Sequence, residues 1–217
     1  MRATTTKLMA LPSSARRGRF LGVLAAELKI MLKGQDRLWY LGAIGLNVAC
    51  LFNPSPAVRP YLLAAVWLWP LAVWSQMGAR ERRFNTGQIV LSAPRPAVRQ
   101  LPATWLAGVI VAIVLNSGGW LWLVLAGETA SLLGWFVGAL FVPGLALALG
   151  VWTGTSRAFE AGYLFLWYIG AVEGVPGLDY TGVSDASAAI STRLAYLVLA
   201  VGLLAVAMIG RWRRSPA

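Results

Sequence analysis

The sequence predicts an all-α membrane protein: six transmembrane helices, N-in and C-in, preceded by an amphipathic interfacial helix. Of its 217 residues, 58% are hydrophobic and only 12% are charged. Soluble domains have about 45–50% apolar and about 25% charged residues. A soluble protein of this length has too large a surface-to-volume ratio to hide so much apolar surface. A lipid bilayer is therefore the solvent that fits this composition.

The six spans are predicted from six apolar stretches of the chain. Crossing the hydrocarbon core takes about 20 helical residues, which three stretches reach while the other three have only roughly 15–17. Pro70 predicts a kink in the second stretch, because proline removes one helical hydrogen bond. In order, the stretches lie near Leu38–Phe52, Tyr61–Met77, Leu101–Leu125, Ser131–Trp152, Ala158–Val172 and Ile190–Ile209.

Tryptophan and glycine add two expectations about these spans. Glycines in the fourth stretch, at Gly138, Gly144 and Gly150, predict close helix contacts. The indole ring favours the headgroup layer of a membrane, although some tryptophans will be packing residues. Several of the 11 Trp residues lie near the ends of apolar stretches: Trp39, Trp67, Trp74, Trp105, Trp120, Trp135, Trp152 and Trp212.

The basic residues are distributed unevenly over the predicted loops. All but two of the 19 lysines and arginines fall on one side, in the tails and in the loops after the second and fourth spans. The positive-inside rule makes this the cytoplasmic side of a cell (inner or plasma) membrane. The net charge of +11 is then a topology signal and not a prediction of nucleic-acid binding. The other side receives Arg59, Arg193, Glu128, Glu173, Asp179 and Asp185.

The chain divides into a short series of segments around one membrane domain. A basic cytoplasmic tail (1–19) without the apolar core of a signal peptide comes first. Residues 20–34 form a helix with Lys29 and Lys33 opposite an apolar face, which predicts a helix lying in the interface, or alternatively one packed on a partner. The six-helix domain (35–210) carries a cytoplasmic loop (78–100) and an outer loop (173–189) that forms a short helix or dips back into the membrane. A basic tail (211–217) ends the chain. The apolar face of 20–34 consists of Phe20, Leu21, Leu24, Leu28, Met31 and Leu32.

Residue types missing from the sequence argue against an enzyme. There is no histidine, the commonest metal ligand and general base. The single cysteine, Cys50, cannot form an intrachain disulfide. All three lysines precede the first span, and no Gly-x-x-x-x-Gly-Lys-Ser/Thr phosphate loop occurs. We therefore expect no catalytic residue, cofactor or metal on this chain.

Polar residues within the spans are candidates for a pathway or for helix contacts. Arg157 and Glu160 are spaced i, i+3 and can pair on one helix face. A carboxylate near hydrocarbon is expensive unless it is paired, so this pair either anchors the fifth helix or marks a pathway. Tyr163 and Tyr168 follow at helical spacing, and Asn116 lies inside the third span, where each can line a cavity or pack against a neighbour.

The most informative loop follows the second span, from Gly78 to Pro94. It begins with charged residues, turns at Asn85-Thr86-Gly87, becomes apolar at Ile89–Leu91 and stops at Pro94. A short amphipathic element continuous with two spans can transmit a push from a soluble partner, although it is also compatible with an ordinary positive-inside loop. The candidate coupling residues are Arg80, Glu81, Arg82, Arg83, Thr86, Gly87, Gln88, Leu91 and Pro94.

This loop resembles the one that follows the second span of ABC-2 type permeases, the membrane subunits of a class of ATP-driven exporters. Glu81, Arg82, Thr86, Leu91, Ser92 and Pro94 match that pattern. Gln88 stands where the family often has Glu, and the lysine often found near the start of the third span is absent. The likeness extends over most of the chain as architecture.

The resemblance implies a permease that pairs with a second permease domain, as a homodimer or heterodimer, and with ABC ATPase subunits. ATP and Mg would then be bound by the partner ATPase and not by this chain, and Arg80–Pro94 would dock on it. The alternative that the sequence leaves open is a non-transporting membrane scaffold or an accessory subunit.

Overall fold

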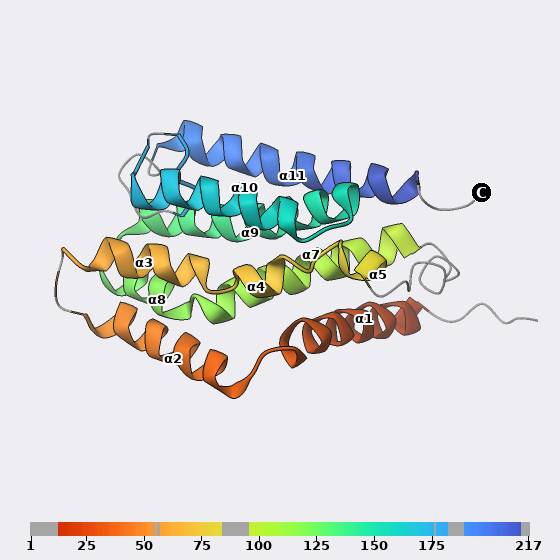
Figure 1. Ribbon diagram of the computed structural model, residues 1–217, viewed down its shortest axis with the longest axis horizontal. Coiled ribbons are helices and arrows are strands. Elements are labelled where there is room, and N and C mark those ends of the chain that lie inside the picture. Colours follow the sequence, from red (N-terminus) through yellow and green to blue (C-terminus); the bar gives the residue numbers. More distant parts are fainter. Residues whose placement is uncertain are drawn as a thin grey trace, which may run out of the picture.

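The computed structural model describes residues 13–53, 55, 57–83, 96–175, 177–181 and 189–213. Helices account for all of the regular structure in these residues, and they run side by side along the long axis of the molecule (Figure 1). The helices are α1 (Ser13–Lys33), α2 (Arg37–Phe52), α3 (Arg59–Leu68), α4 (Leu71–Trp74), α5 (Arg80–Arg83), α7 (Pro96–Leu115), α8 (Ser117–Leu125), α9 (Thr129–Thr153), α10 (Arg157–Trp167), the π-helix η1 (Tyr168–Val172) and α11 (Ile190–Trp212).

The predicted all-helical fold is confirmed for this part of the chain, and each of the six apolar stretches is helical. Two helices, α9 and α11, are long and apolar enough to cross a membrane. The pair Gln100–Leu115 and α8 passes the same test but is bent by 61°, so it gives a third candidate span only if the two count as one. The six-span topology therefore remains a prediction.

Two of the predicted spans are interrupted. Pro70 separates α3 from α4, as its missing N–H predicts. The third stretch breaks at Asn116 between α7 and α8. The Asn47 side chain lies at this break, where its amide donates to Leu115 O and its oxygen accepts from Gly118 N. A neighbouring helix thus supplies hydrogen bonds that the broken helix has lost.

The two ends of the bundle differ in charge. One end, which we call the basic end, holds the starts of α1, α7 and α10, the whole of α5 and the end of α11 (Figure 1). The arginines at this end whose side chains the structure describes are Arg80, Arg82, Arg83, Arg157, Arg211 and Arg213. The opposite end, which we call the far end, holds the α2–α3, α8–α9 and η1–α11 connections. There Arg59 begins α3 and Arg193 lies in the first turn of α11.

The core surrounds α9, which packs against α7, α8, α10 and α11. Trp67, Trp74 and Trp135 are fully buried in this core, so these three are among the tryptophans that act as packing residues. Two of the three α9 glycines make the predicted close approaches. A β-carbon at Gly138 would lie 2.2 Å from Tyr180 O, and one at Gly150 would lie 2.0 Å from Met77 O.

Helix α1 begins at Ser13, earlier than the expected 20–34, and ends at Lys33 before Gly34. Its axis follows the bundle, and its apolar face packs against α7 of the same chain (Figure 1). Leu24 and Met31 are buried, while Lys29 and Lys33 are exposed. The predicted amphipathic character is thus present, and part of the apolar face is covered by protein.

Candidate functional site

A polar cluster joins four helices at the basic end. Glu27 on α1 accepts from Arg80 Nη1 on α5 at 3.3 Å and from Gln100 Nε2 on α7 at 3.3 Å. The Gln100 oxygen accepts in turn from Arg211 Nη2 on α11 at 3.1 Å. We call Glu27, Arg80, Gln100 and Arg211 the polar cluster. It connects the first and last helices of the described chain through one carboxylate and one amide.

These hydrogen bonds matter for stability because the charged groups that they join are largely buried. Glu27 and Arg211 are each only 7% exposed. A buried charge is costly unless it is paired and hydrogen-bonded. Both oxygens of Glu27 have donors, and the one facing Arg80 forms an ion pair. Removing one partner of such a pair costs about 3–5 kcal/mol, because the other charge is left uncompensated.

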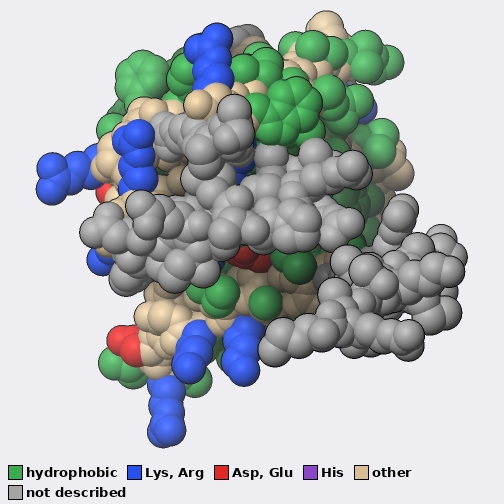
Figure 2. Space-filling model, turned by 90° about the vertical axis from the view of Figure 1, so that its right-hand side faces the viewer, with side chains coloured by type: hydrophobic (Ala, Val, Ile, Leu, Met, Phe, Trp, Pro, Cys, Tyr) green, Lys and Arg blue, Asp and Glu red, His purple; other side chains and the backbone are tan. Residues whose placement is uncertain are grey.

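The polar cluster borders a small cavity of about 160 Å³. Gln76 and Thr104 add polar groups to its wall, and Met77 and Leu147 add apolar ones. At about 30 Å³ per molecule, a space of this size holds several waters. Figure 2 looks onto this end of the molecule and shows Lys and Arg side chains around the edge of the end. A polar cluster beside a cavity of this size is typical of a water-containing contact between helices rather than of a reaction centre.

The predicted coupling loop begins and ends at the polar cluster. Arg80 and Gln100 lie on either side of residues 84–95, which fall outside the described part of the chain. Arg82 reaches the end of α9, where its Nη1 donates to Thr153 O at 3.2 Å. Arg83 is exposed, and Glu81 lies within α5. The remaining loop candidates lie among the undescribed residues: Thr86, Gly87, Gln88, Leu91 and Pro94.

Glycines fix the approach to the coupling loop. Gly78 has a φ of +72°, in the left-handed region that favours glycine. Its backbone crosses α9 so closely that a β-carbon would lie 2.7 Å from Leu147 O. Gly150 on α9 faces the same crossing. These contacts place α5 against the end of α9, so Arg80 points into the polar cluster and Arg82 caps α9.

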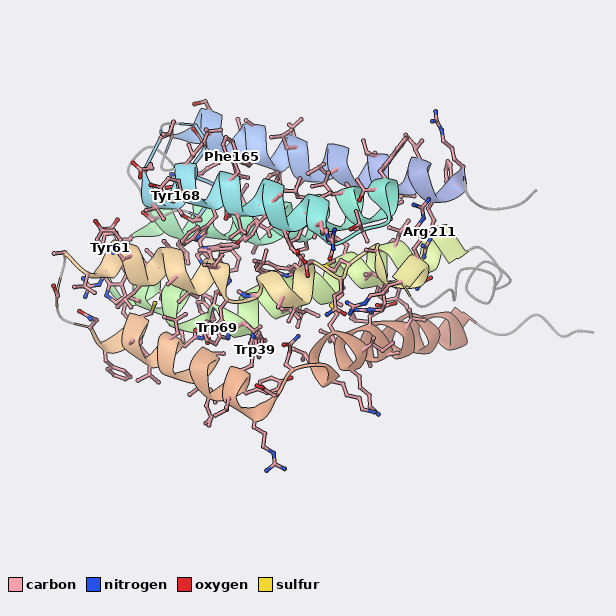
Figure 3. All side chains as sticks on the ribbon, in the orientation of Figure 1. Trp39, Tyr61, Trp69, Phe165, Tyr168 and Arg211 are labelled. Carbon is pink, nitrogen blue, oxygen red and sulfur yellow. The ribbon has the colours of Figure 1, made fainter. Side chains whose placement is uncertain are left out.

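The five predicted intramembrane residues do not gather into one site. Asn116 is fully buried at the α7–α8 break, and its side-chain atoms have no hydrogen-bond partner among the described residues. Tyr163 is fully buried and donates to Trp67 O at 2.7 Å. Tyr168 lies on the surface of η1, 53% exposed (Figure 3). Arg157 and Glu160 form no ion pair with each other in the described structure, so the expected pairing was wrong.

Several residues of these sites were not predicted from the sequence. Glu27 is an acidic residue on the apolar face of α1, between Leu24 and Met31, and this position was the available signal. Gln100 and Arg211 carry no local signal, because contacts distant in sequence bring them together. The same holds for Tyr180, which comes from the outer loop and is buried in the core.

The fold and these sites define an all-helical protein with two to three helices able to cross a membrane, suggesting a membrane protein. No protein-family model, curated protein or solved structure matches the chain. No group of three or more His, Cys, Asp or Glu residues able to hold a metal ion occurs in the described part of the chain.

Proposed function

We propose that the chain is the membrane-spanning permease subunit of an ABC transporter, which moves a substrate using ATP hydrolysed by a separate ATPase subunit. In this proposal the six apolar stretches cross the plasma membrane or inner membrane, and the basic end faces the cytoplasm. The distribution of arginines between the two ends supports that orientation. A second permease domain, identical or related, completes the transporter.

One observation supports this function above the others. The loop with the permease-like pattern starts beside Arg80 and ends beside Gln100, and both side chains hydrogen-bond to the same carboxylate, Glu27. Gln100 also holds Arg211 of α11. A displacement of the loop is therefore passed through buried polar contacts to α1, α7 and α11 together. A coupling element needs this kind of stiff connection to the helices that it moves.

The alternative function is a non-transporting scaffold or accessory subunit. The observation that favours it is the filled centre of the bundle. Trp67, Trp74 and Trp135 are buried there beside Tyr163 and Tyr180, and their rings contact one another in the middle of the bundle. A transporter must open that region, whereas a scaffold does not need to.

The test is purification of the tagged protein in mild detergent from a host that carries the native neighbouring genes, followed by an ATPase assay on the eluate. We expect an ATPase to co-purify. Glu81→Lys reverses a charge of the loop and should abolish co-purification or coupling while the protein stays folded and inserted. Glu128→Lys, an exposed carboxylate at the far end, is the matched control and should retain the ATPase.

An eluate without ATPase from that host contradicts the permease and supports the scaffold. An ATPase that binds Glu81→Lys as it binds the wild type, with unchanged coupling, contradicts the docking role of the loop.

A further inference from the structure

A short segment at the far end folds back into the bundle. Residues 177–181 follow η1, and Asp179, Tyr180 and Thr181 are only 1–2% exposed. The turn is held by Asp179 Oδ1, which accepts hydrogen bonds from the amide and the hydroxyl of Thr181. Residues 177–181 of the outer loop thus enter the helix bundle. We call residues 177–181 the plug.

Glycines allow the plug to enter. A β-carbon at Gly138 of α9 would lie 2.2 Å from Tyr180 O, and one at Gly170 of η1 would lie 2.2 Å from Leu178 O. Only glycine tolerates such close backbone contacts. Gly174 before the plug and Gly177 at its start have φ values of +64° and +84°, which favour glycine as well. The plug is therefore packed against backbone and has permissive backbone positions at and before its start.

The Tyr180 ring sits among four other aromatic rings. Its centroid lies 5.6 Å from Trp67, 5.9 Å from Phe141, 5.9 Å from Tyr163 and 6.3 Å from Tyr196. These rings come from α3, α9, α10 and α11, so four helices converge on one side chain. The Trp67 contact is edge-to-face, a favoured aromatic geometry. We call the four surrounding rings the aromatic seat.

Tyr180 is held in the aromatic seat mainly through its ring. Its buried hydroxyl interacts with the Tyr163 side chain but makes no hydrogen bond of regular geometry with the described residues. A tyrosine phenol is neutral at pH 7. The site thus holds a neutral phenol that is well surrounded through its ring and only weakly engaged through its polar group.

We propose that the aromatic seat is a ligand site, and that it accepts a neutral aromatic ring with one small polar substituent when the plug withdraws. Tyr180 stands in for this ligand, because its phenol has that chemistry. The aromatic surroundings select flat apolar rings. The identification of this ligand as the transported substrate rests on the proposed function. The binding of the ligand at the aromatic seat does not depend on that function.

The first experiment empties the seat. Tyr180→Ala, purified in detergent, is melted with and without p-cresol, which is the tyrosine side chain itself. Apolar cavities made by truncation can bind aromatic molecules of matching shape. We expect p-cresol to raise the melting temperature by roughly 5 °C at a hundredfold excess over its Kd. Tyr168→Ala, which truncates an exposed tyrosine (Figure 3), should show no such shift.

The second experiment asks whether the plug withdraws in a chain that keeps Tyr180. Thr181→Cys is made with Cys50→Ala, and its maleimide labelling rate is measured with and without 1-naphthol. Thr181 is 1% exposed, so labelling should be slow. A ligand that occupies the seat shifts the population toward the withdrawn plug. We expect labelling to rise severalfold with 1-naphthol and to saturate.

Gly138→Ala in the same background should speed labelling without any ligand, because its methyl group displaces Tyr180 O. Gly202→Ala is the matched control, since nothing lies within 4 Å of a β-carbon there.

The outcomes separate the proposals. Folded Tyr180→Ala that gains nothing from p-cresol overturns the ligand site. Rescue by p-cresol with labelling that 1-naphthol leaves unchanged also overturns it, because Tyr180 is then a permanent core residue. If Tyr180→Ala does not fold, the labelling experiment alone decides. Neither measurement uses an ATPase, so a failure here is distinct from a failure of the proposed function.

Discussion

The two ends of the bundle use opposite chemistry to hold their helices together. At the basic end, Glu27 and Gln100 link four helices through hydrogen bonds that satisfy both carboxylate oxygens. At the far end, four helices meet around Tyr180 through ring contacts, and its hydroxyl makes no hydrogen bond of regular geometry with the described residues. A satisfied polar network resists separation, because each broken bond leaves a buried polar group behind. Ring contacts are less directional, and another ring can replace them.

This difference assigns different mechanical properties to the two ends. The polar cluster is suited to transmit a displacement without being broken, which is what the proposed coupling to an ATPase needs. The aromatic seat is suited to exchange its occupant, which is what the proposed ligand site needs. Four substitutions test this comparison, in order of decreasing expected effect.

Glu27→Ala should have the largest effect. It leaves the partly buried Arg80 guanidinium without its carboxylate and Gln100 without its acceptor, and the expected loss is up to about 3–5 kcal/mol of unfolding free energy. Thermal unfolding in detergent measures it. Glu128→Ala removes an exposed carboxylate that makes no side-chain cap and should change stability little. Equal melting temperatures for the two variants would show that the polar cluster does not hold the basic end together.

Gly150→Ala should have the next largest effect on stability. Its methyl group would lie 2.0 Å from Met77 O, and backbone must move to admit it. Overpacking of this kind costs about 1–3 kcal/mol. Gly202→Ala has open space, and helix propensity predicts that it gains up to about 1 kcal/mol. Opposite signs for these two glycines in the same melting assay are expected, and a shared sign would contradict the close crossing of Gly78 over α9.

Tyr163→Phe should have a moderate effect. The substitution keeps the buried ring but removes the hydroxyl that donates to Trp67 O at 2.7 Å. The carbonyl loses its donor in a buried place, at a cost of about 1–2 kcal/mol. Chemical denaturation of the two proteins measures the difference. A variant as stable as the wild type would mean that this carbonyl has another donor.

Tyr180→Phe should have the smallest effect, and its sign is informative. The hydroxyl makes no hydrogen bond of regular geometry with the described residues, so removing it should leave stability within about 0.5 kcal/mol or raise it. The same measurement as for Tyr163→Phe allows a direct comparison of two buried tyrosines in contact. A loss as large as that of Tyr163→Phe would show that the Tyr180 hydroxyl is bonded.

The apolar stretches predicted the helices well because helix formation in an apolar chain depends mainly on local sequence. Composition alone could not predict the break at Asn116, since Asn47 on another helix stabilises it. Which tryptophans are packing residues, as Trp67, Trp74 and Trp135 are, could not be predicted for a similar reason. A tryptophan near the end of an apolar stretch has the same local sequence whether it faces lipid or core.

The candidate site was predicted less completely. The loop after the second span was singled out by its pattern, but its central residues lie outside the described structure and its role remains a prediction. The polar cluster that flanks it was not predicted. Glu27, Gln100 and Arg211 are far apart in the sequence, and nothing near any one of them indicates its partners.

The interruption at Pro70 has a consequence for how this sequence can change over evolution. Because α3 ends at Leu68, the Trp67 carbonyl lies in a last helical turn, where carbonyls lack intrahelical donors. Tyr163 supplies the donor from α10. Positions 70 and 163 are thus linked although they are distant in sequence. Among homologues, those with proline at 70 should keep tyrosine at 163. Homologues in which another residue at position 70 lets the helix continue should also accept phenylalanine at position 163.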